Sequence, residues 1–443
     1  MVRFNAPFFY LCNENFTGIS LKIITKKIKM SKKNLNKCSF CGKPRDQVQI
    51  LVSGVDGDIC ENCIVQAKQI IDTEINPGSR ASSAPKAALP KNIKPKNIKE
   101  YLDEYVIGQD EAKKVIAVAV YNHYKRLNQV IADDEVEIEK SNILLVGRTG
   151  TGKTLIAKSI AKLLNVPFAI VDATVFTEAG YVGEDVESIL SRLLQVCNYD
   201  TVQAERGIVY IDEVDKIARK SDNPSITRDV SGEGVQQAML KLLEGTEVLV
   251  PPHGGRKHPE QKLLKIDTKN ILFICGGSFD GIDKAISRRL NTSVLGFKKE
   301  KKGEEIDKEN LLQYITHQDI KSFGLIPELI GRLPVLAHLE ELDKEALTNI
   351  LTKPKNALLK QYEKLFKLEN IDLEFDAAAI DFIVDKALEY KLGARGLRSI
   401  CEAIITDAMY ELPSQPNIKK YVVTEEYAKQ KLNKSKLSKL KVA

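Results

Sequence analysis

The stretch that decides the fold of this chain is Gly147-Arg148-Thr149-Gly150-Thr151-Gly152-Lys153-Thr154. It fits the pattern G-x-x-x-x-G-K-[ST], with an apolar run at residues 142–146 before it and a helical pattern at 155–161 after it. A glycine-rich loop between a strand and a helix directs backbone N–H groups and the positive end of the helix dipole at an anion. The pattern predicts binding of a nucleoside triphosphate, with Lys153 at the β- and γ-phosphates and the Thr154 hydroxyl on Mg²⁺.

A second pattern is the apolar run 208–211, which ends in Asp212 and Glu213. In P-loop ATPases the acid after this strand helps to hold Mg²⁺. A neighbouring carboxylate is well placed to polarise the attacking water. Two ordinary surface acids are the alternative reading. Together with the glycine-rich loop, the pattern favours an ATPase that turns over, with Asp212 on Mg²⁺ and Glu213 as general base.

Length and composition set the broad class of the protein. The 443 residues suggest about three domains on a prior of ~150 residues each. The net charge of +6 is spread over 66 basic and 60 acidic residues, so it gives only a weak indication of acidic partners. No run approaches the ~18 apolar residues of a membrane span. We expect a soluble protein with no membrane partner.

Four of the eight cysteines form the pairs Cys38-x2-Cys41 and Cys60-x2-Cys63, with eighteen residues between the pairs. This spacing is typical of a zinc site. Four thiolates complete a tetrahedral shell and leave no position for water, so we expect structural Zn²⁺ in a reducing compartment. Disulfides or redox thiols are the alternatives. Nearby lysines suggest a nucleic-acid role, but Phe40 alone is too little aromatic surface for base stacking.

Beyond a Pro/Ser/Ala-rich linker, apolar runs alternate with helical patterns. Nearly continuous apolar runs suit the central strands of a parallel sheet with helices on both faces. The strand candidates are residues 142–146, 168–171, 207–211, 270–275 and 334–339. From about residue 342 the pattern turns mainly helical, with one strand candidate at 371–375, which predicts a smaller domain. The expected fold class is therefore α/β.

The expected domain organisation has five parts. These are an extension at 1–29, a zinc domain at 30–75, a flexible linker at 76–95, a large α/β ATPase domain at 96–341 and a small domain at 342–443. The extension lacks the order of a signal peptide. A transit peptide is one reading of it. The preferred reading is an upstream start codon, with Met30 as the true beginning and residues 1–29 disordered or absent.

Two arginines occupy positions that an oligomeric ATPase requires. Arg332 precedes the last strand candidate of the large domain, where an arginine can reach a neighbour's γ-phosphate. Arg395 opens a helix of the small domain and can sense the nucleotide in cis. Arginine is common on surfaces, so spacing alone does not decide these roles.

From about Lys37 to its last helices the chain resembles the ClpX family of AAA+ unfoldases. Residues 105–112, Tyr-Val-Ile-Gly-Gln-Asp-Glu-Ala, resemble the segment that packs on adenine, which implies contacts from Val106 and Ile107. Residues 326–332 resemble the arginine-finger segment and 393–395 the second sensor. The resemblance therefore implies the AAA+ fold and gives Arg332 and Arg395 their roles.

The resemblance also implies residues that handle the protein substrate. Tyr181 and Val182 match the pore loop that grips substrate, and residues 221–233 match a second pore loop. Arg256, Lys257 and His258 match the basic loop at the pore entrance. Leu295-Gly296-Phe297 stands where the family's peptidase-docking loop has Ile-Gly-Phe. Leucine keeps the volume and apolar character of isoleucine, so docking should survive at a cost below ~1.5 kcal/mol.

The resemblance implies an ATP-dependent unfoldase, itself not a peptidase. It is expected to form a homo-hexamer that recognises tagged substrates and adaptors, threads substrates through its pore and delivers them to a ClpP-type peptidase. The zinc module is expected to dimerise. The expected location is the bacterial cytoplasm, with an organelle matrix less favoured.

Two other classes of protein share part of this pattern. A nucleic-acid motor or clamp loader has the same sheet and a zinc module, but it should carry a basic groove with stacking aromatics. The near-balanced charge argues against specific nucleic-acid binding. A scaffold that binds ATP without hydrolysing it would lack a base after Asp212, and Glu213 is present.

Overall fold

The structure is a computed structural model of the chain. It describes residues 37–54, 57–74, 93–129, 136, 138–177, 183–219, 232–251, 263–292, 307, 310–390, 393–415 and 417–434. The chain divides into two compact units, residues 1–83 and 84–443, and each is described by itself.

The first unit is a small module with a very small core. Its elements are η1 (Arg45–Gln47), the antiparallel hairpin β1 (Leu51–Ser53) and β2 (Asp58–Cys60), and α1 (Glu61–Glu74). Between residues 37 and 67, the buried side chains in the described part are Cys38, Asp58 and Cys60. Because so little apolar surface is buried, this module needs a further source of folding free energy.

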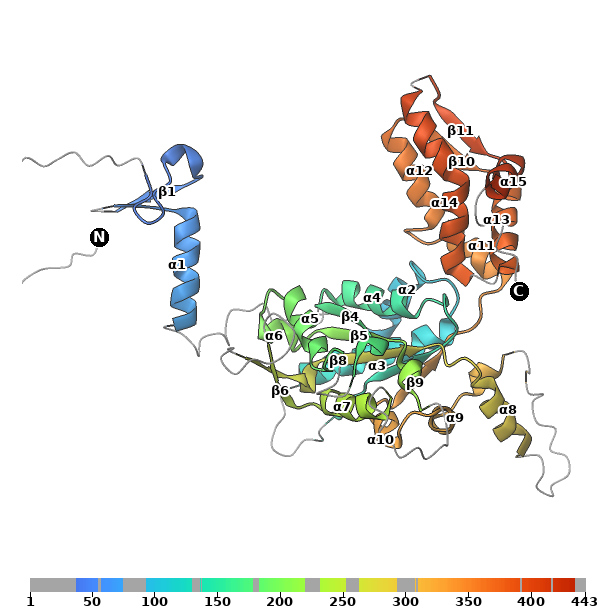
Figure 1. Cartoon of the computed structure of the whole chain (residues 1–443), viewed down its shortest axis with the longest axis horizontal. Helices are drawn as coiled ribbons and strands as arrows, with labels where there is room; N and C mark the ends of the chain where they lie inside the picture. The colour runs from blue at the N-terminus through green and yellow to red at the C-terminus, as the bar shows by residue number, and fades with distance from the viewer. Residues whose placement is uncertain are drawn as a thin grey trace, which may run out of the picture. The chain divides into compact units, whose positions relative to one another are not determined.

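A five-stranded parallel sheet forms the centre of the second unit (Figure 1). Its strands lie in the order β4-β5-β8-β3-β9, with every neighbouring pair parallel. The strands are β3 (Ile143–Val146), β4 (Phe168–Asp172), β5 (Ile208–Asp212), β8 (Leu272–Gly277) and β9 (Val335–His338). Since all five run the same way, their carboxyl ends share one edge of the sheet, where open α/β sheets bind ligands.

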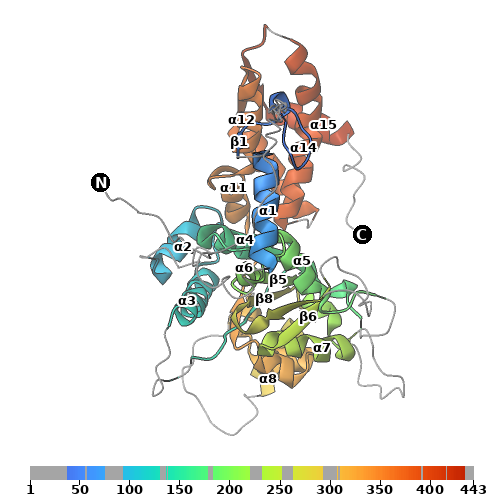
Figure 2. The ribbon, with the colours of Figure 1, turned by 90° about the vertical axis from the view of Figure 1, so that its left-hand side faces the viewer.

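Alternate residues of the central strands feed two separate hydrophobic cores, as the two-residue period of a strand requires. On one face, Ile143 and Leu145 pack with α2 (Pro95–Asp103), α3 (Asp110–Leu127) and α4 (Lys153–Leu164). On the other, Leu144 and Val146 pack with a second helical layer. That layer comprises α5 (Ser188–Val196), α7 (Glu233–Glu244), α8 (Asp283–Thr292), α9 (His317–Phe323) and α10 (Pro327–Gly331). Figure 2 shows α3 and α7 on opposite sides of the sheet.

Shorter elements complete this part of the unit. The antiparallel pair β6 (Glu247–Val250) and β7 (Leu264–Asp267) lies outside the parallel sheet. The remaining elements are α6 (Thr201–Ala204), η3 (Ala173–Val175), η4 (Val214–Ile217), η5 (Thr268–Asn270) and η6 (Leu311–Tyr314).

The C-terminal part of the second unit has a hydrophobic core of its own, formed by residues between 347 and 432. Its helices cluster around the parallel pair of β10 (Asp372–Phe375) and β11 (Lys420–Val423) (Figure 1). They are α11 (Lys344–Thr352), α12 (Leu358–Leu368), α13 (Ala377–Glu389), α14 (Gly393–Glu411) and α15 (Glu425–Lys434), with the short η7 (Leu412–Ser414).

The predicted fold class is confirmed: a parallel α/β sheet, a mainly helical C-terminal region and a four-cysteine module. Each strand candidate corresponds to an observed strand whose ends differ by at most two residues. Five strands were not predicted from the sequence, each three or four residues long: β1, β2, β6, β7 and β11. Within the described residues, no helix has both the length and the apolar character needed to cross a membrane.

Asn142 joins three segments at the start of β3. Its Nδ2 donates to the carbonyl oxygens of Leu243 (3.3 Å) and Arg332 (2.8 Å). Its Oδ1 accepts from the Phe273 N–H at 3.4 Å, and the side chain is only 1% exposed. This one amide therefore ties α7, β8 and the residue after α10 to the strand that leads into the glycine-rich loop.

Replacing Asn142 with Ala should lower the free energy of unfolding by about 2–4 kcal/mol, because three buried backbone groups lose their partner. Chemical denaturation measures this loss. Asn128→Ala is the control, since the exposed Asn128 donates one hydrogen bond to the Tyr124 carbonyl, and it should cost less than about 1 kcal/mol. Equal losses of unfolding free energy in the two variants would show that the buried hydrogen bonds of Asn142 contribute no extra stability.

Candidate nucleotide-binding and metal sites

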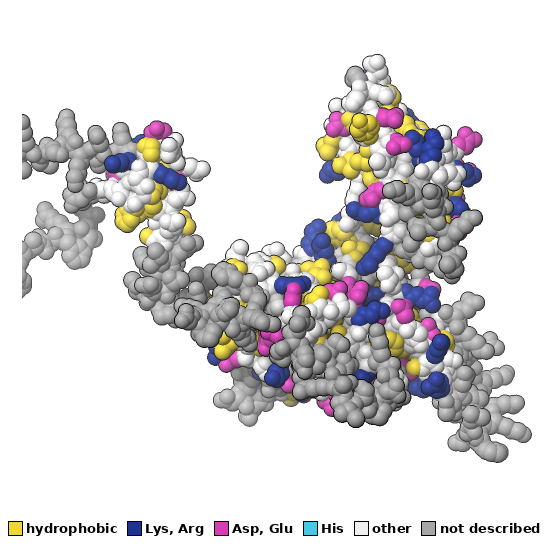
Figure 3. All heavy atoms as spheres, viewed as in Figure 1, with side chains coloured by type: hydrophobic (Ala, Val, Ile, Leu, Met, Phe, Trp, Pro, Cys, Tyr) yellow, Lys and Arg dark blue, Asp and Glu magenta, His cyan; other side chains and the backbone are white. Residues whose placement is uncertain are grey.

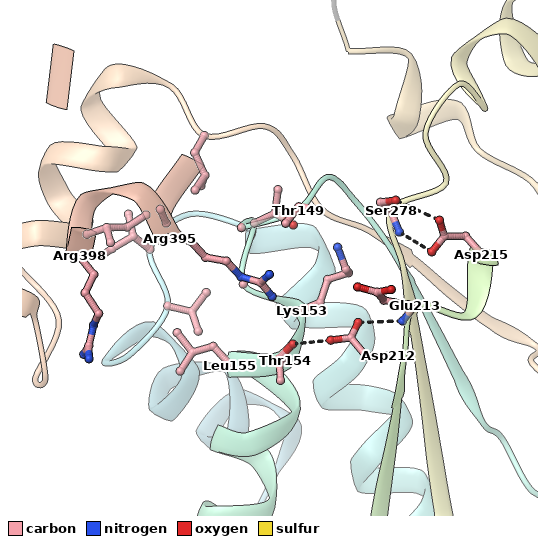
Figure 4. Close-up of a pocket in the computed structure, with 18 of the residues that line it drawn as sticks. Thr149, Lys153, Thr154, Leu155, Asp212, Glu213, Asp215, Ser278, Arg395 and Arg398 are labelled. Carbon is pink, nitrogen blue, oxygen red and sulfur yellow. Dashed lines mark hydrogen bonds between the residues drawn. The ribbon is translucent and has the colours of Figure 1, made fainter. Parts of the chain in front are cut away.

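A cavity of about 490 Å³ lies where the sheet's carboxyl edge meets α14, within the ~300–1,000 Å³ range of small-molecule sites. It is lined by Tyr105, Val106, Ile107, Thr149, Gly150, Thr151, Gly152, Lys153, Thr154, Leu155, Asp212, Glu213, Asp215, Lys216, Ser278, Asp280, Leu342, Ile350, Ala394, Arg395 and Arg398. The structure thus brings together the glycine-rich loop, the acids after β5 and the arginine of α14 from segments far apart in the sequence (Figure 4).

The glycine-rich loop has the backbone geometry of a phosphate cradle. Gly150 and Gly152 have φ values of +87° and +105°, in the left-handed region that glycine adopts without steric cost. Gly152 is the N-cap of α4, so the unpaired N–H groups of the first helical turn lie beside the cavity. These donors and the helix dipole provide an anion-binding site.

Lys153 is the buried cation of this loop, with 8% of its surface exposed. Its Nζ donates to the carbonyl oxygens of Gly147 and Arg148, the latter at 3.0 Å. Burial lowers the pKa of Lys153, while the charge of Asp212 acts in the opposite direction. Since an ammonium group carries three donors and lines the cavity, Lys153 is placed to bind anionic oxygens there.

The acids at the end of β5 face the start of α4 (Figure 4). The Thr154 hydroxyl donates to Asp212 Oδ2 at 3.3 Å, and the Glu213 N–H donates to Asp212 Oδ1 at 3.0 Å. Glu213 has a φ of +56°, which is rare for a residue other than glycine. Such backbone strain clusters at functional sites. A hydroxyl and a carboxylate converge here, and hard oxygen donors of this kind suit Mg²⁺.

Five polar residues of this cavity were not predicted from the sequence: Asp215, Lys216, Ser278, Asp280 and Arg398. Ser278 directly follows β8 and donates to Asp215 from its N–H (3.1 Å) and its hydroxyl (3.0 Å). Asp215 is 6% exposed and also pairs with Lys216 at 3.3 Å. A polar residue directly after a buried apolar strand is a signal that could have identified Ser278, because β8 ends at the same edge of the sheet as β3 and β5.

An apolar wall closes another side of the cavity. Tyr105, Val106 and Ile107 from the connection between α2 and α3 line it together with Leu342 and Ile350. Val106 is 4% exposed. A wall of this kind suits the flat apolar faces of a nucleotide base.

Three consecutive residues after β9 each contact a segment of the nucleotide site, and we call Leu339, Glu340 and Glu341 the linker triad. A Cβ added at Gly147 would lie 2.8 Å from the Leu339 Cβ, so the loop and the linker are in close contact. The Gln109 amide exchanges two hydrogen bonds with the Glu340 backbone, at 2.9 and 2.8 Å. Arg148 pairs with Glu341 at 2.9 Å.

The two predicted arginines lie in different places. Arg395, near the start of α14, points toward the glycine-rich loop, whereas Arg398 points away from it (Figure 4). Gly150 packs against this helix start, since a Cβ there would lie 3.4 Å from the Ala394 nitrogen. Arg332 is not part of the cavity lining; it pairs with Glu244 at 2.9 Å, and its side chain is 53% exposed.

The four cysteines of the first unit form a compact cluster, with all sulfur atoms within 4.8 Å of one another. The Cys38–Cys63 and Cys41–Cys60 sulfur distances are 3.8 and 3.7 Å, and all four cysteines are free. Disulfide bonds of ~2.05 Å are therefore absent from this cluster. Tetrahedral Zn–S bonds of about 2.3 Å place sulfurs roughly 3.8 Å apart, so the cluster fits Zn²⁺.

The remaining predicted site residues lie outside the described residues. They are Tyr181 and Val182 of the pore loop, Arg256, Lys257 and His258 of the basic loop, and Leu295, Gly296 and Phe297 of the docking loop.

Three family models match successive parts of the chain. The "ClpX C4-type zinc finger" matches residues 36–73, the "AAA domain (Cdc48 subfamily)" residues 138–336, and the "C-terminal, D2-small domain, of ClpB protein" residues 342–424.

Curated relatives match nearly the whole chain, and three of them are each named "ATP-dependent Clp protease ATP-binding subunit ClpX". The protein of Bacteroides thetaiotaomicron is 60% identical over 411 residues, which cover 93% of this chain and 99% of the relative. That of Porphyromonas gingivalis is 60% identical over 404 residues (91% and 97%). That of Treponema denticola is 52% identical over 404 residues (90% and 95%).

Removing the metal should unfold residues 37–74 and leave the second unit intact, because the first unit has almost no core while the second has three. Cys60→Ser should lose bound zinc and become sensitive to protease within this module, at an unchanged melting temperature of the second unit. Cys197→Ala, a cysteine outside the cluster, is the control and should keep one zinc per chain. Full zinc content in Cys60→Ser would contradict the four-thiolate site.

Proposed function

The chain belongs to the ClpX family of AAA+ ATPases, and from this membership we propose that it is an ATP-dependent unfoldase. It recognises tagged proteins, threads them through the pore of a homo-hexamer and passes them to a ClpP-type peptidase. One observation carries the proposal: a single cavity unites the glycine-rich loop, the acids after β5 and Arg395 of α14. Relatives named as Clp protease subunits and covered over 95% or more of their length support the partner.

In the proposed ATPase site, the chain's own residues bind and orient the nucleotide. Lys153 and the N–H groups of the loop bind the phosphates, in the segment formed by Gly147, Arg148, Thr149, Gly150, Thr151, Gly152 and Thr154. Thr154 and Asp212 hold Mg²⁺, which when bound neutralises charge on the phosphate oxygens. Val106 and Ile107 pack against the base.

Glu213 is the proposed general base. It lines the cavity directly beside Asp212, and its N–H bond to Asp212 fixes the backbone that carries its side chain. A carboxylate at this position can accept the proton of a water that attacks the γ-phosphate. The strained backbone of Glu213 is consistent with a residue held for function.

Arg332 and Arg395 have different proposed partners. Arg395 lines the cavity of its own chain and senses the nucleotide in cis. Arg332 lies outside that lining with an exposed side chain, which suits an arginine that reaches the γ-phosphate bound by the neighbouring subunit.

Substrate handling is assigned to residues outside the described ones, so it rests on the family resemblance alone. Tyr181 and Val182 grip an extended chain by bulk and dispersion. Arg256, Lys257 and His258 attract acidic segments or a C-terminal carboxylate. Leu295, Gly296 and Phe297 insert into an apolar cleft of the peptidase. We further propose that the zinc module dimerises and receives adaptors, and that the protein acts in the bacterial cytoplasm.

The charge distribution favours a protein substrate over a nucleic acid. On the face shown in Figure 3, Lys and Arg side chains are interspersed with Asp and Glu. A nucleic-acid motor needs a continuous basic surface with aromatic side chains for stacking.

The unfoldase proposal is tested with a degradation-tagged green fluorescent protein, ATP and the cognate peptidase. The native chain should abolish the fluorescence. Glu213→Gln should still bind ATP but hydrolyse it about 100-fold more slowly, because general-base catalysis contributes 10²–10⁴-fold. If ATP is hydrolysed but the fluorescence stays constant, either the tag is not recognised or the peptidase does not dock. A second tag and a peptidase-binding assay then distinguish these two causes. A verified hexamer with neither activity would refute the proposal, and DNA-stimulated turnover would favour the nucleic-acid motor.

The trans role of Arg332 predicts complementation between two inactive variants. Arg332→Ala and Glu213→Gln should each be nearly inactive alone. In hexamers mixed in equal amounts, about a quarter of the sites combine an intact Glu213 with an intact neighbouring Arg332, since each ring interface joins two different surfaces. ATPase activity should therefore recover on mixing. Lys153→Ala mixed with Glu213→Gln is the control: both residues line the cavity of one chain, so no site in the mixed ring has both intact and activity should not recover. No recovery would place Arg332 in cis.

A further inference from the structure

We propose that Tyr210 is a positioning residue that fixes the orientation of the Asp212 carboxylate and so sets how strongly Mg²⁺ supports nucleotide binding. The inference rests on the proposed role of Asp212 in the ATPase site. It adds to that site a residue that does not line the cavity but contacts Asp212 through its hydroxyl and lies beside the Thr154 hydroxyl.

Tyr210 lies inside the core between the sheet and α4, with no exposed surface. It stands two residues before Asp212 on β5, so both side chains are on the same face of the strand. The phenol reaches along this face, and its hydroxyl donates to Asp212 Oδ1 at 3.1 Å. The ring is buried among apolar groups while its polar end meets the acid at the edge of the sheet.

The two oxygens of Asp212 have different partners. Oδ1 accepts from the Tyr210 hydroxyl and from the Glu213 N–H at 3.0 Å. Oδ2 accepts from the Thr154 hydroxyl at 3.3 Å. Two donors on one oxygen restrain rotation of the carboxylate, and the second oxygen is thereby held toward Thr154, the other proposed metal-binding residue. Partners behind a ligand commonly orient it in this way.

The neighbouring strand provides space for this hydroxyl. A Cβ added at Gly276 of β8 would overlap the Tyr210 hydroxyl and lie 2.8 Å from its Cζ. Gly276 has no positive φ, so its backbone conformation does not demand glycine. Glycine is required at position 276 by the close approach of the Tyr210 phenol, because any side chain there would displace the phenol. Two strands therefore contribute to the same placement.

The Tyr210 hydroxyl is the donor in its bond to Asp212. Burial raises the pKa of Tyr210, and the charge of Asp212 raises it further. A hydrogen bond to a charged group is stronger than one between neutral groups, which suits a fixed orientation.

Tyr210→Phe removes this one oxygen. The probe is a fluorescent, non-hydrolysable ATP analogue, and its affinity is measured with Mg²⁺ and with a metal chelator. We expect the metal-free affinity to stay within about twofold of the native value. The additional affinity conferred by Mg²⁺ should fall on the order of 10-fold, the lower end of the range for residues that orient metal ligands. Gly276→Ala keeps the phenol but displaces it, and should cause the same selective loss.

The chain offers a matched control in Tyr124→Phe. Tyr124 is 2% exposed, belongs to the same hydrophobic core and also donates one hydrogen bond, to the Arg206 carbonyl at 3.1 Å. Loss of the Tyr124 hydroxyl should lower the stability of the protein about as much as Tyr210→Phe does. It should leave unchanged the gain in nucleotide affinity that Mg²⁺ confers. In an Asp212→Asn background, Tyr210→Phe should produce no further change in the Mg²⁺ effect, because Tyr210 acts through that carboxylate.

The outcomes separate this inference from the proposed function. An unchanged Mg²⁺ effect in Tyr210→Phe would overturn the inference. So would loss of metal-free binding, since the hydroxyl would then serve the fold instead of the metal. If Asp212→Asn itself left the Mg²⁺ effect intact, the proposed role of Asp212 would fail, and the role of Tyr210 with it.

Discussion

The parallel alignment of β3, β5 and β8 is the constraint on which the rest of the site depends. Because these strands run the same way, three segments end at one edge of the sheet: the loop to α4, the Asp212–Glu213 pair and Ser278. The register of these strands is maintained by burial on both faces, since alternate residues pack into two different cores. A change of register by one residue would exchange those faces and move Asp212 away from Thr154.

The site also depends on buried or half-buried polar groups that hold its backbone and its acidic side chains in place. Asn142 anchors the start of β3, Ser278 fixes Asp215, and Tyr210 contacts Asp212 from within the core. Each is buried or half-buried and hydrogen-bonded to a neighbouring segment or side chain. Buried polar groups of this kind cost stability when left unpaired, so they favour one arrangement over its neighbours.

Features encoded in short, contiguous motifs could be predicted from the sequence, whereas contacts set by the folded sheet could not. The glycine-rich loop, the acids after β5 and the cysteine pairs are short motifs whose spacing carries their chemistry, and the fold class followed from the apolar runs. Three contacts were not predicted: Ser278 with Asp215, Tyr210 with Asp212, and Gln109 with Glu340. Their partners lie 63, 2 and 231 residues apart in the sequence, and only the folded sheet brings the bonding atoms together. Tyr210 in particular resembles any other core aromatic until its hydroxyl is placed. The proposed role of Arg332 needed the family resemblance, since spacing alone could not decide it.

The linker triad has a mechanical consequence. Leu339 is packed on Gly147, Glu340 is paired with Gln109 and Glu341 with Arg148. The chain leaving β9 is therefore attached both to the glycine-rich loop and to the segment that follows the apolar wall of the cavity. A pull along the linker triad is therefore transmitted to the glycine-rich loop and to Gln109 through these contacts. By thermodynamic reciprocity, if tension on the linker changes nucleotide affinity, nucleotide binding changes the extension of the linker under that tension.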